Sequence, residues 1–156
     1  MSRGLGDVYK RQTVDNTQAL DPEIGTNELS VIFAEAKDCH VYKSSWMEKF
    51  GEWKHEYCVS NLNRGGKIIW TVDVKSPGTY QVELKVRGNG RVVWKVETDE
   101  GQMAQNQQSA SSIFCKRPIG WIRFDKPGRH TITVNMPEGG KQADISSISM
   151  TPIYFE

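Results

Sequence analysis

Apolar and polar residues alternate with a period of two along most of the chain after about Val31. The clearest runs cover residues 67–74, 79–87 and 91–97, where an apolar residue recurs at every second position. Such alternation places one face of a strand on a core and the other toward water, as in antiparallel sheets. No segment after residue 31 shows a sustained helical period. The pattern therefore predicts an all-β domain, and its register puts the side chains of Trp70 and Trp94 in the core.

Short segments rich in Gly and Pro separate these runs. Lys75–Gly78 (KSPG) and Gly88–Gly90 (GNG) predict tight turns, because Gly adopts the positive φ that such turns need. Three strands joined by two turns within residues 67–97 predict a meander. Further strands are expected over about Val31–Glu35 and Asp144–Thr151.

One stretch of the sequence occurs twice in similar form. Residues 72–84 (VDVKSPGTYQVEL) align without gaps on residues 122–134 (IRFDKPGRHTITV). Each copy reads as a strand, a Pro-Gly turn and a second strand, with Tyr80 in the first copy where the second has His130. Two copies of one hairpin, with further strands around each, predict an antiparallel, jelly-roll-like β-sandwich of two facing sheets.

The remaining segments are less regular. Ser44–Lys54 fits either one helical turn or a folded loop, and Gly101–Ser112 fits either an edge strand or a long loop. Residues 13–30 are typical of a linker or the end of a preceding domain. The last six of residues 1–12 (MSRGLGDVYKRQ) can be encoded by a DNA string that resembles the transposase end used in sequencing adaptors, so we expect a non-native segment there. The predicted sandwich covers residues 31–153.

The composition is that of an ordinary soluble domain. The 156 residues suffice for one domain with a core. The net charge of +1 shows no basic excess of the kind that nucleic-acid binders carry, and no apolar run approaches the ~20 residues of a membrane helix. We therefore expect neither nucleic acid nor membrane as a partner. Cys39, Cys58 and Cys115 lack zinc-site spacing, which leaves a Cys39–Cys58 bridge and three small buried hydrophobes as open alternatives.

Several segments together resemble a known kind of domain. The string WTVDVKSPGTYQVEL over residues 70–84, Ala34–Ala36, the segment 127–134 and the closing strand 148–152 are similar to galactose-binding-like jelly rolls. Such carbohydrate-binding-type domains commonly lie C-terminal to glycoside hydrolase barrels, notably in the α-L-fucosidase family.

The resemblance implies a non-catalytic accessory domain that targets an enzyme to glycans. Its expected partners are a glycan or oligosaccharide and an upstream catalytic barrel in a longer parent chain, and its expected location is periplasmic or secreted. A (β/α)₈ barrel needs about 250 residues, so the chemistry is expected outside this chain. The alternative is a structural appendage that packs on the barrel and binds no sugar.

Two groups of residues are candidates for sugar binding. Strand periodicity puts Trp121 and Arg123 on the polar face of their strand, where Trp121 is either a sugar platform or covered by a neighbouring loop. The segment Ser45–Asn63 is rich in aromatic and polar side chains, which either bind a ligand as loops often do or form a small satellite core. The candidates in this segment are Trp46, Trp53, Tyr57 and Asn61.

A structural calcium ion is a further implication of the resemblance. Many of the resembled domains hold calcium with acidic groups from the first and last strands, and Glu35 and Asp144 occupy comparable places. Calcium takes six to eight oxygens, so two solvated surface carboxylates are the competing interpretation.

The sequence does not predict catalysis. Glycoside hydrolysis needs two carboxylates that face each other across a cleft, whereas Asp99 and Glu100 are adjacent in a turn-like stretch. The three histidines, His40, His55 and His130, lie in no recognisable nucleophile motif. We expect His130 to be packed and hydrogen-bonded, because it takes the place of Tyr80 in the second copy of the repeat.

Overall fold

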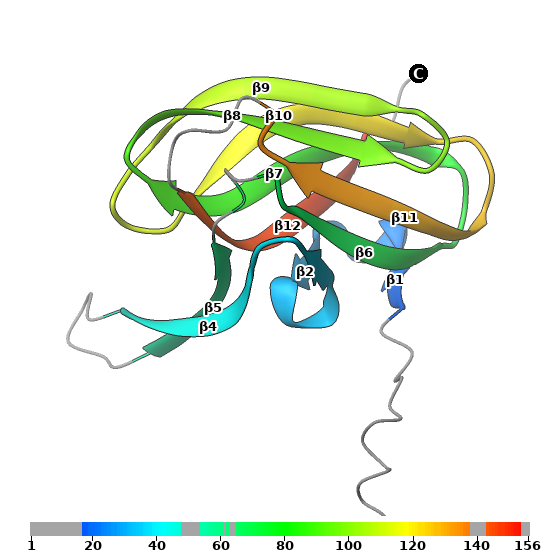
Figure 1. Cartoon of the computed structure of the whole chain (residues 1–156). Helices are drawn as coiled ribbons and strands as arrows, with labels where there is room; N and C mark the ends of the chain where they lie inside the picture. The colour runs from blue at the N-terminus through cyan, green and yellow to red at the C-terminus, as the bar shows by residue number, and fades with distance from the viewer. Residues whose placement is uncertain (1–16, 48–53, 61, 63–64, 138–142, 154–156) are drawn as a thin grey trace, which may run out of the picture.

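The chain folds into two β-sheets that face each other (Figure 1). The computed structural model describes residues 17–47, 54–60, 62, 65–137 and 143–153, and for 40–47 and 54–56 it describes the backbone. Almost all described pairings are antiparallel, the parallel pair β1–β6 being the exception. The predicted all-β sandwich is confirmed.

The first sheet has the strand order β1-β6-β11-β8-β9, with β3 paired to β6. Its strands are β1 (Gln18–Leu20), β3 (Glu35–Lys37), β6 (Lys67–Val74), β8 (Gly90–Thr98), β9 (Met103–Ala110) and β11 (Gly128–Asn135). The second sheet has the order β10-β7-β12-β5-β4, with β2 paired to β12. Its strands are β2 (Asn27–Ser30), β4 (His40–Met47), β5 (Lys54–Ser60), β7 (Gly78–Gly88), β10 (Cys115–Phe124) and β12 (Ala143–Ile153).

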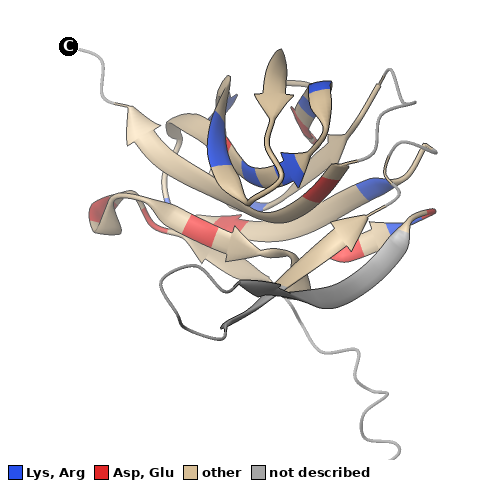
Figure 2. Cartoon of the chain, turned by 90° about the vertical axis from the view of Figure 1, so that its left-hand side faces the viewer, with Lys and Arg blue, Asp and Glu red and all other residues tan. Residues whose placement is uncertain are grey.

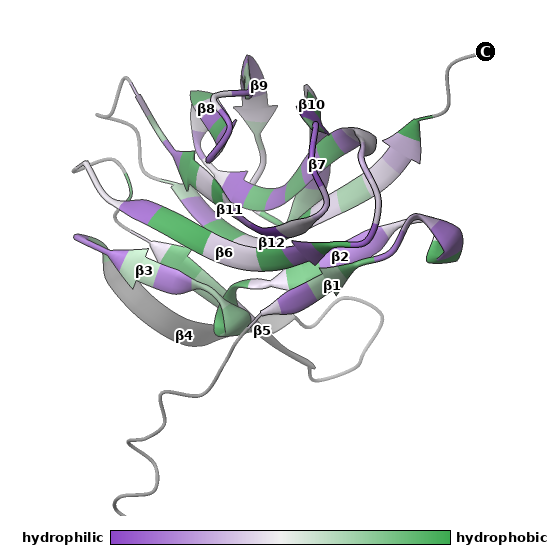
Figure 3. Ribbon diagram, turned by 90° about the vertical axis from the view of Figure 1, so that its right-hand side faces the viewer, coloured by the Kyte–Doolittle hydropathy of each residue, from purple (hydrophilic) through white to green (hydrophobic). Residues whose placement is uncertain are grey.

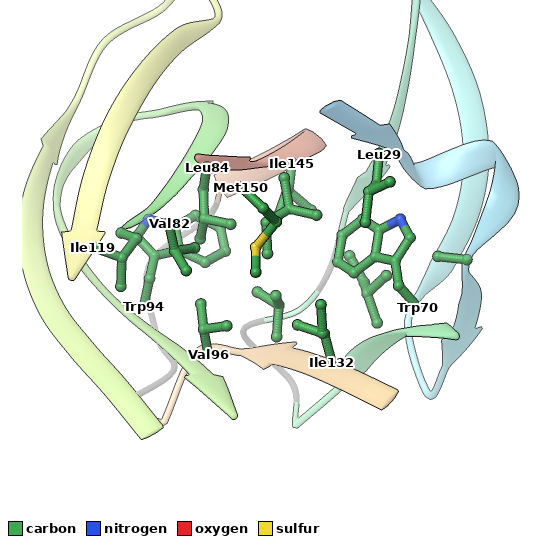
Figure 4. Packing of buried hydrophobic residues seen from close by; sticks show 14 of the residues in the cluster. Leu29, Trp70, Val82, Leu84, Trp94, Val96, Ile119, Ile132, Ile145 and Met150 are labelled. Atoms are coloured by element: carbon green, nitrogen blue, oxygen red, sulfur yellow. The ribbon is translucent and has the colours of Figure 1, made fainter. Parts of the chain in front are cut away.

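The core lies between the two sheets and follows the predicted alternation. Apolar and polar residues alternate along β6 and β7 (Figure 3), and every second side chain is buried. Trp70 and Trp94 are both 0% exposed, as predicted. Apolar side chains from the two sheets meet between these indoles (Figure 4); they are Val82, Leu84, Ile145 and Met150 from the second sheet and Val96 and Ile132 from the first.

The predicted meander and hairpins are wrong, because the strands that they joined lie in different sheets. β6 belongs to the first sheet and β7 to the second, and the chain crosses back at β8. β10 and β11 are likewise divided between the sheets. The three residues 75–77 can span the ~10 Å between packed sheets. Period two tells which face of a strand is buried, and it leaves the strand's partner undetermined.

The repeated stretches pair with each other across this crossover. β6 pairs with β11 and β7 pairs with β10, so Val72 lies opposite His130 while Tyr80 lies opposite Ile122. In the gapless alignment Val72 matches Ile122 and Tyr80 matches His130. The two copies are therefore related by an approximate two-fold axis, with each copy contributing one strand to each sheet.

The N-terminal prediction needs correction from Gln18 onward. Residues 18–30, expected to be a linker or the end of a preceding domain, contribute β1 and β2 to the two sheets, and Leu20 and Leu29 are buried. The strand expected over Val31–Glu35 is instead the 3-10 helix η2 (Val31–Phe33), preceded in the chain by η1 (Pro22–Ile24). Strands of three or four residues are too short to show a periodicity.

Gly101–Ser112 contains an edge strand, β9, and residues 44–47 and 54 lie in β4 and β5 rather than in a helical turn; residues 48–53 lie outside the described part. None of Cys39, Cys58 and Cys115 forms a disulfide bond in the described structure. Within the described residues, no helix is both long enough and apolar enough to span a membrane.

Candidate functional site

Trp121 lies on the outer face of the second sheet. It follows an irregularity in the β10–β7 register between Pro118 and Gly120, after which Ile122 and Phe124 point into the core. Trp121 itself is 58% exposed. The predicted outward orientation of Trp121 is confirmed, and no loop among the described residues covers it.

Polar side chains lie on β10 beside the indole and in its row across the sheet. The register places Trp121 opposite Gln81, and Gln81 opposite Thr151, in one row across β10, β7 and β12. Thr151 Oγ1 lies 2.9 Å from Thr26 Oγ1. Arg123, two residues along β10, donates from Nε to Asp125 Oδ1 at 2.7 Å. An exposed ring flanked by amide, hydroxyl and guanidinium groups can pack on an apolar face and hydrogen-bond polar substituents around it.

Tyr57 and the backbone of Trp46 lie toward the opposite edge of the same sheet. Tyr57 on β5 is 49% exposed, and β7 and β12 lie between β5 and β10. Trp46 has a backbone position on β4 opposite His55. Trp53 and Asn61 are outside the described residues. The structure therefore does not bring Tyr57 and Trp121 together, and their roles in binding stay predictions.

The two calcium candidates lie in different sheets. Glu35 on β3 is 3.7 Å from Lys37 Nζ. Asp144 on β12 accepts a hydrogen bond from Arg87 Nε at 3.0 Å, and the Arg87 guanidinium also lies 4.6 Å from the centroid of the Phe114 ring. The described residues contain no group of three or more His, Cys, Asp or Glu that could hold a metal. Calcium binding stays a prediction.

His130 is hydrogen-bonded through both of its ring nitrogens. Its Nδ1 lies 2.9 Å from Asp99 Oδ1, and its Nε2 lies 2.7 Å from the Lys126 carbonyl oxygen. Burial disfavours the charged ring, but the hydrogen bonds to Asp99 and Lys126 and the attraction of Asp99 and Glu100 outweigh it, so the pKa of His130 is raised. Two acceptors require two N–H donors, which is the imidazolium form. His130 is packed and hydrogen-bonded, as predicted.

A polar cavity of about 440 Å³ lies where β9 and β10 approach each other. Its lining residues come from both sheets and are Arg91, Gln107, Gln108, Ser109, Arg117 and Pro118. This cavity was not predicted from the sequence. The polar run over Gly101–Ser112 is the one signal for it, and alternation does not show which strands pair with that run.

Comparisons with known proteins show the fold of the chain. No family model matches the sequence, and no curated protein matches it. A Podospora anserina GH26-CBM35 β-(1,4)-mannanase has a TM-score of 0.61 at 16% identity, over 85% of this chain and 28% of that protein. A Phanerochaete chrysosporium exo-β-1,3-galactanase has a TM-score of 0.57 at 17% identity, over 80% of this chain and 29% of that protein.

The same fold also occurs outside carbohydrate-active enzymes. A Bacillus thuringiensis Cry1Da tryptic core variant has a TM-score of 0.66 at 10% identity, over 89% of this chain and 25% of that protein. In all three cases the chain spans less than a third of the similar protein. Because these proteins share so little sequence with the chain, the comparisons show its fold alone. That fold is a β-sandwich of a kind found within larger proteins.

Proposed function

We propose that this chain is a non-catalytic carbohydrate-binding domain and that Trp121 makes its main contact with sugar. The observation that carries the proposal is the 58% exposure of a Trp side chain on an open sheet face. Covering that ring with the apolar side of a pyranose removes apolar surface from water on both partners. Gln81 and Thr151, in the same row, can hydrogen-bond the hydroxyl groups of the sugar.

We further propose that the domain serves a glycoside hydrolase. The structural similarity to parts of a mannanase and a galactanase supports this role, and the sequence resemblance favours a parent of the α-L-fucosidase family. In such a parent, which would be secreted or periplasmic, the domain would bind the glycan and so keep the catalytic barrel close to its substrate.

The contacts of the acidic residues near His130 support a non-catalytic role for the domain. Asp99 is engaged by His130, and Glu100 Oε1 accepts a hydrogen bond from the backbone N–H of Asp125 at 2.8 Å. Asp99 thus joins the β8–β9 turn to β11, and Glu100 joins it to the β10–β11 connection. The two carboxylates do not face each other across a cleft as a glycosidase pair must.

Titration calorimetry against a small glycan panel tests the proposal. The panel contains fucosylated and galactosylated oligosaccharides together with β-1,4-mannan and β-1,3-galactan fragments. We expect Trp121→Ala to weaken binding by about tenfold or more, which corresponds to ~1.4 kcal/mol, and Trp121→Phe to weaken it less. Tyr57→Ala is the matched control, because it removes an exposed ring from β5, which is separated from β10 by two strands of the same sheet.

Two outcomes would contradict the proposal. If Tyr57→Ala weakens binding and Trp121→Ala does not, the site lies on the β4–β5 side. If no oligosaccharide binds at millimolar concentration, the domain does not bind these sugars at all. Incubation of the domain with each oligosaccharide, followed by product analysis, tests for hydrolysis in parallel.

A structural appendage is the second candidate function, and exposed apolar side chains on the 3-10 helices favour it. Ile24 on η1 is 66% exposed, and Ile32 and Phe33 on η2 are each 39% exposed. If they pack on a catalytic barrel, Phe33→Ser in the parent enzyme lowers its melting temperature and leaves glycan affinity unchanged. If the chain is a binding domain, Trp121→Ala instead lowers its affinity for glycans.

A further inference from the structure

The cavity between β9 and β10 brings together two arginines from different sheets. The β8–β9 register places Arg91 opposite Ser109 in the first sheet. Arg117, on β10 of the second sheet, donates from Nε to the Ser109 carbonyl oxygen at 3.0 Å. Both arginines line the same cavity. Ser109 therefore connects two positive side chains that the sequence separates widely.

Side-chain to backbone hydrogen bonds hold this arrangement in place. Gln108 Nε2 donates to the Pro118 carbonyl oxygen at 2.7 Å, and Asn106 Nδ2 donates to the same oxygen at 3.5 Å. With the bond from Arg117 to Ser109, these contacts fasten the edge of one sheet to the edge of the other. A site of this kind is largely formed before a ligand arrives, which lowers the entropic cost of binding.

The charge of the cavity is not neutralised by the described residues. No Asp or Glu is among the described residues that line it. The described contact of Arg117 is with a neutral carbonyl oxygen, and Arg91 makes no hydrogen bond or ion pair with the described part of the chain. By contrast, Arg87 and Arg123 have carboxylates at 3.0 and 2.7 Å. Figure 2 marks the Lys and Arg positions along the strands in blue.

We infer that this cavity binds the acidic group of an anionic glycan, either a uronate carboxylate or a sulfate ester. The inference rests on the proposed function and specifies the ligand class. Guanidinium groups present planar pairs of N–H donors that match such oxyanions. The amide of Gln107 and the hydroxyl of Ser109, which line the same cavity, can bond the hydroxyl groups of the sugar ring.

The side chains of Arg117 and Trp121 lie on the same strand but point to opposite sides of it, because the register shifts between Pro118 and Gly120. Arg117 and Trp121 both lie on β10, and four residues of strand span roughly 13 Å. A volume of about 440 Å³ lies within the range of small-ligand sites. Arg117 has the inward register of Ile119 and Trp121 has the outward register, so a glycan that reaches both must pass round β10, the edge strand of the second sheet.

Calorimetry with matched acidic and neutral probes tests this inference. The probes are a glucuronate-containing oligosaccharide, its carboxyl-reduced derivative, a sulfated galactan fragment, its desulfated form, and sodium sulfate alone. At low salt we expect the acidic member of each pair to bind about tenfold or more tightly, and the preference to shrink as salt screens the charges. Arg91→Gln should remove the preference, and Arg91→Lys should keep part of it.

Arg129→Gln on β11 is the matched control, because it removes one exposed positive charge outside the cavity. Circular dichroism checks that each variant is folded. Equal affinity for acidic and neutral probes, or an unchanged preference in Arg91→Gln, would overturn the acidic-glycan assignment and leave neutral sugar binding intact. Binding of sulfate alone that depends on Arg91, without binding of any glycan, would overturn the proposed function and the glycan assignment together, leaving an anion site.

Discussion

The imidazole of His130 and the carboxylate of Asp99 join two segments that the sequence places 31 residues apart. Nδ1 of His130 lies 2.9 Å from Asp99 Oδ1, with the His130 side chain 8% exposed and that of Asp99 39% exposed. His130 lies on β11, and Asp99 lies in the β8–β9 turn. The pair fixes one end of the first sheet through a single charged hydrogen bond.

This pair predicts a pH dependence of stability. The pKa of His130 is raised above its ordinary value, so its contribution is fully present below the unfolded-state pKa near 6.5 and is lost as pH rises through the folded-state pKa. The difference in unfolding free energy between wild type and His130→Gln, measured by urea denaturation, should therefore shrink from pH 6 toward pH 8. Taking the difference removes the contributions of His40 and His55. A pH-independent difference would contradict the assignment.

Asp99→Asn tests the partner of the same bond. The substitution keeps a hydrogen-bond acceptor and removes the charge, so we expect the pKa of His130 to fall and stability at pH 6 to drop by about 1–3 kcal/mol. An NMR titration of the His130 ring protons measures the pKa directly. Lys126 supplies a backbone carbonyl, so Lys126→Gln is the control that should leave this pKa nearly unchanged.

Gly66 has no space for a side chain. A Cβ there would lie 2.6 Å from Cys39 Cβ and 2.8 Å from the Asp38 carbonyl oxygen. We expect Gly66→Ala to destabilise the domain by about 1–3 kcal/mol, since overpacking forces backbone to move. Gly78→Ala is the matched control, because a Cβ at Gly78 meets nothing within 4 Å. Equal midpoints of thermal unfolding for the two variants would show that the Cys39 contact relaxes without cost.

The sequence predicted the buried faces of the strands better than it predicted their partners. Trp70 and Trp94 lie in the core as their register predicted, since alternation reports the side on which apolar surface is lost. The partner of a strand depends on whether the connection turns within a sheet or crosses to the other one. A Pro-Gly segment permits both kinds of connection. The sequence therefore did not distinguish the hairpins that were predicted from the crossovers that the structure has.

Period two also decides which parts of the site can be predicted from the sequence. The outward position of Trp121 follows from period two within one strand, and the structure confirms it. The Arg91–Arg117 cavity depends on β9 and β10 meeting across two sheets. No local pattern around Arg91 or Arg117 records that meeting.

The Arg87–Asp144 pair should stabilise the domain without any metal. Its N–O distance is 3.0 Å and the side chains are 27% and 16% exposed, so both charges are partly removed from water. Asp144→Asn in the presence of a chelator should lower the unfolding free energy by about 1–3 kcal/mol. Glu35→Gln, which loses only an exposed contact to Lys37, should cost much less. A loss in Asp144→Asn that appears only when calcium is added would instead favour the calcium prediction.

Trp70 and Trp94 differ in one polar contact and provide the sharpest comparison in the core. Both are fully buried, but Trp70 Nε1 donates to the Ser30 carbonyl oxygen at 3.0 Å, whereas Trp94 Nε1 has no hydrogen-bond partner among the described residues. Replacement by Phe removes similar apolar surface at both positions. In Trp70→Phe it also leaves a buried carbonyl oxygen without its donor, which costs about 1–3 kcal/mol. In Trp94→Phe it removes an unsatisfied N–H.

We therefore expect Trp70→Phe to lower the unfolding free energy by more than Trp94→Phe does. Denaturation monitored by circular dichroism measures both variants on the same scale, without relying on the fluorescence of the indole that was removed. Hydrogen exchange of the two indole N–H groups in the wild-type protein provides an independent check, because the donor that is bonded to Ser30 should exchange more slowly. Equal stability losses together with equal exchange rates would mean that Trp94 Nε1 is bonded as well as Trp70 Nε1, for instance to a buried water.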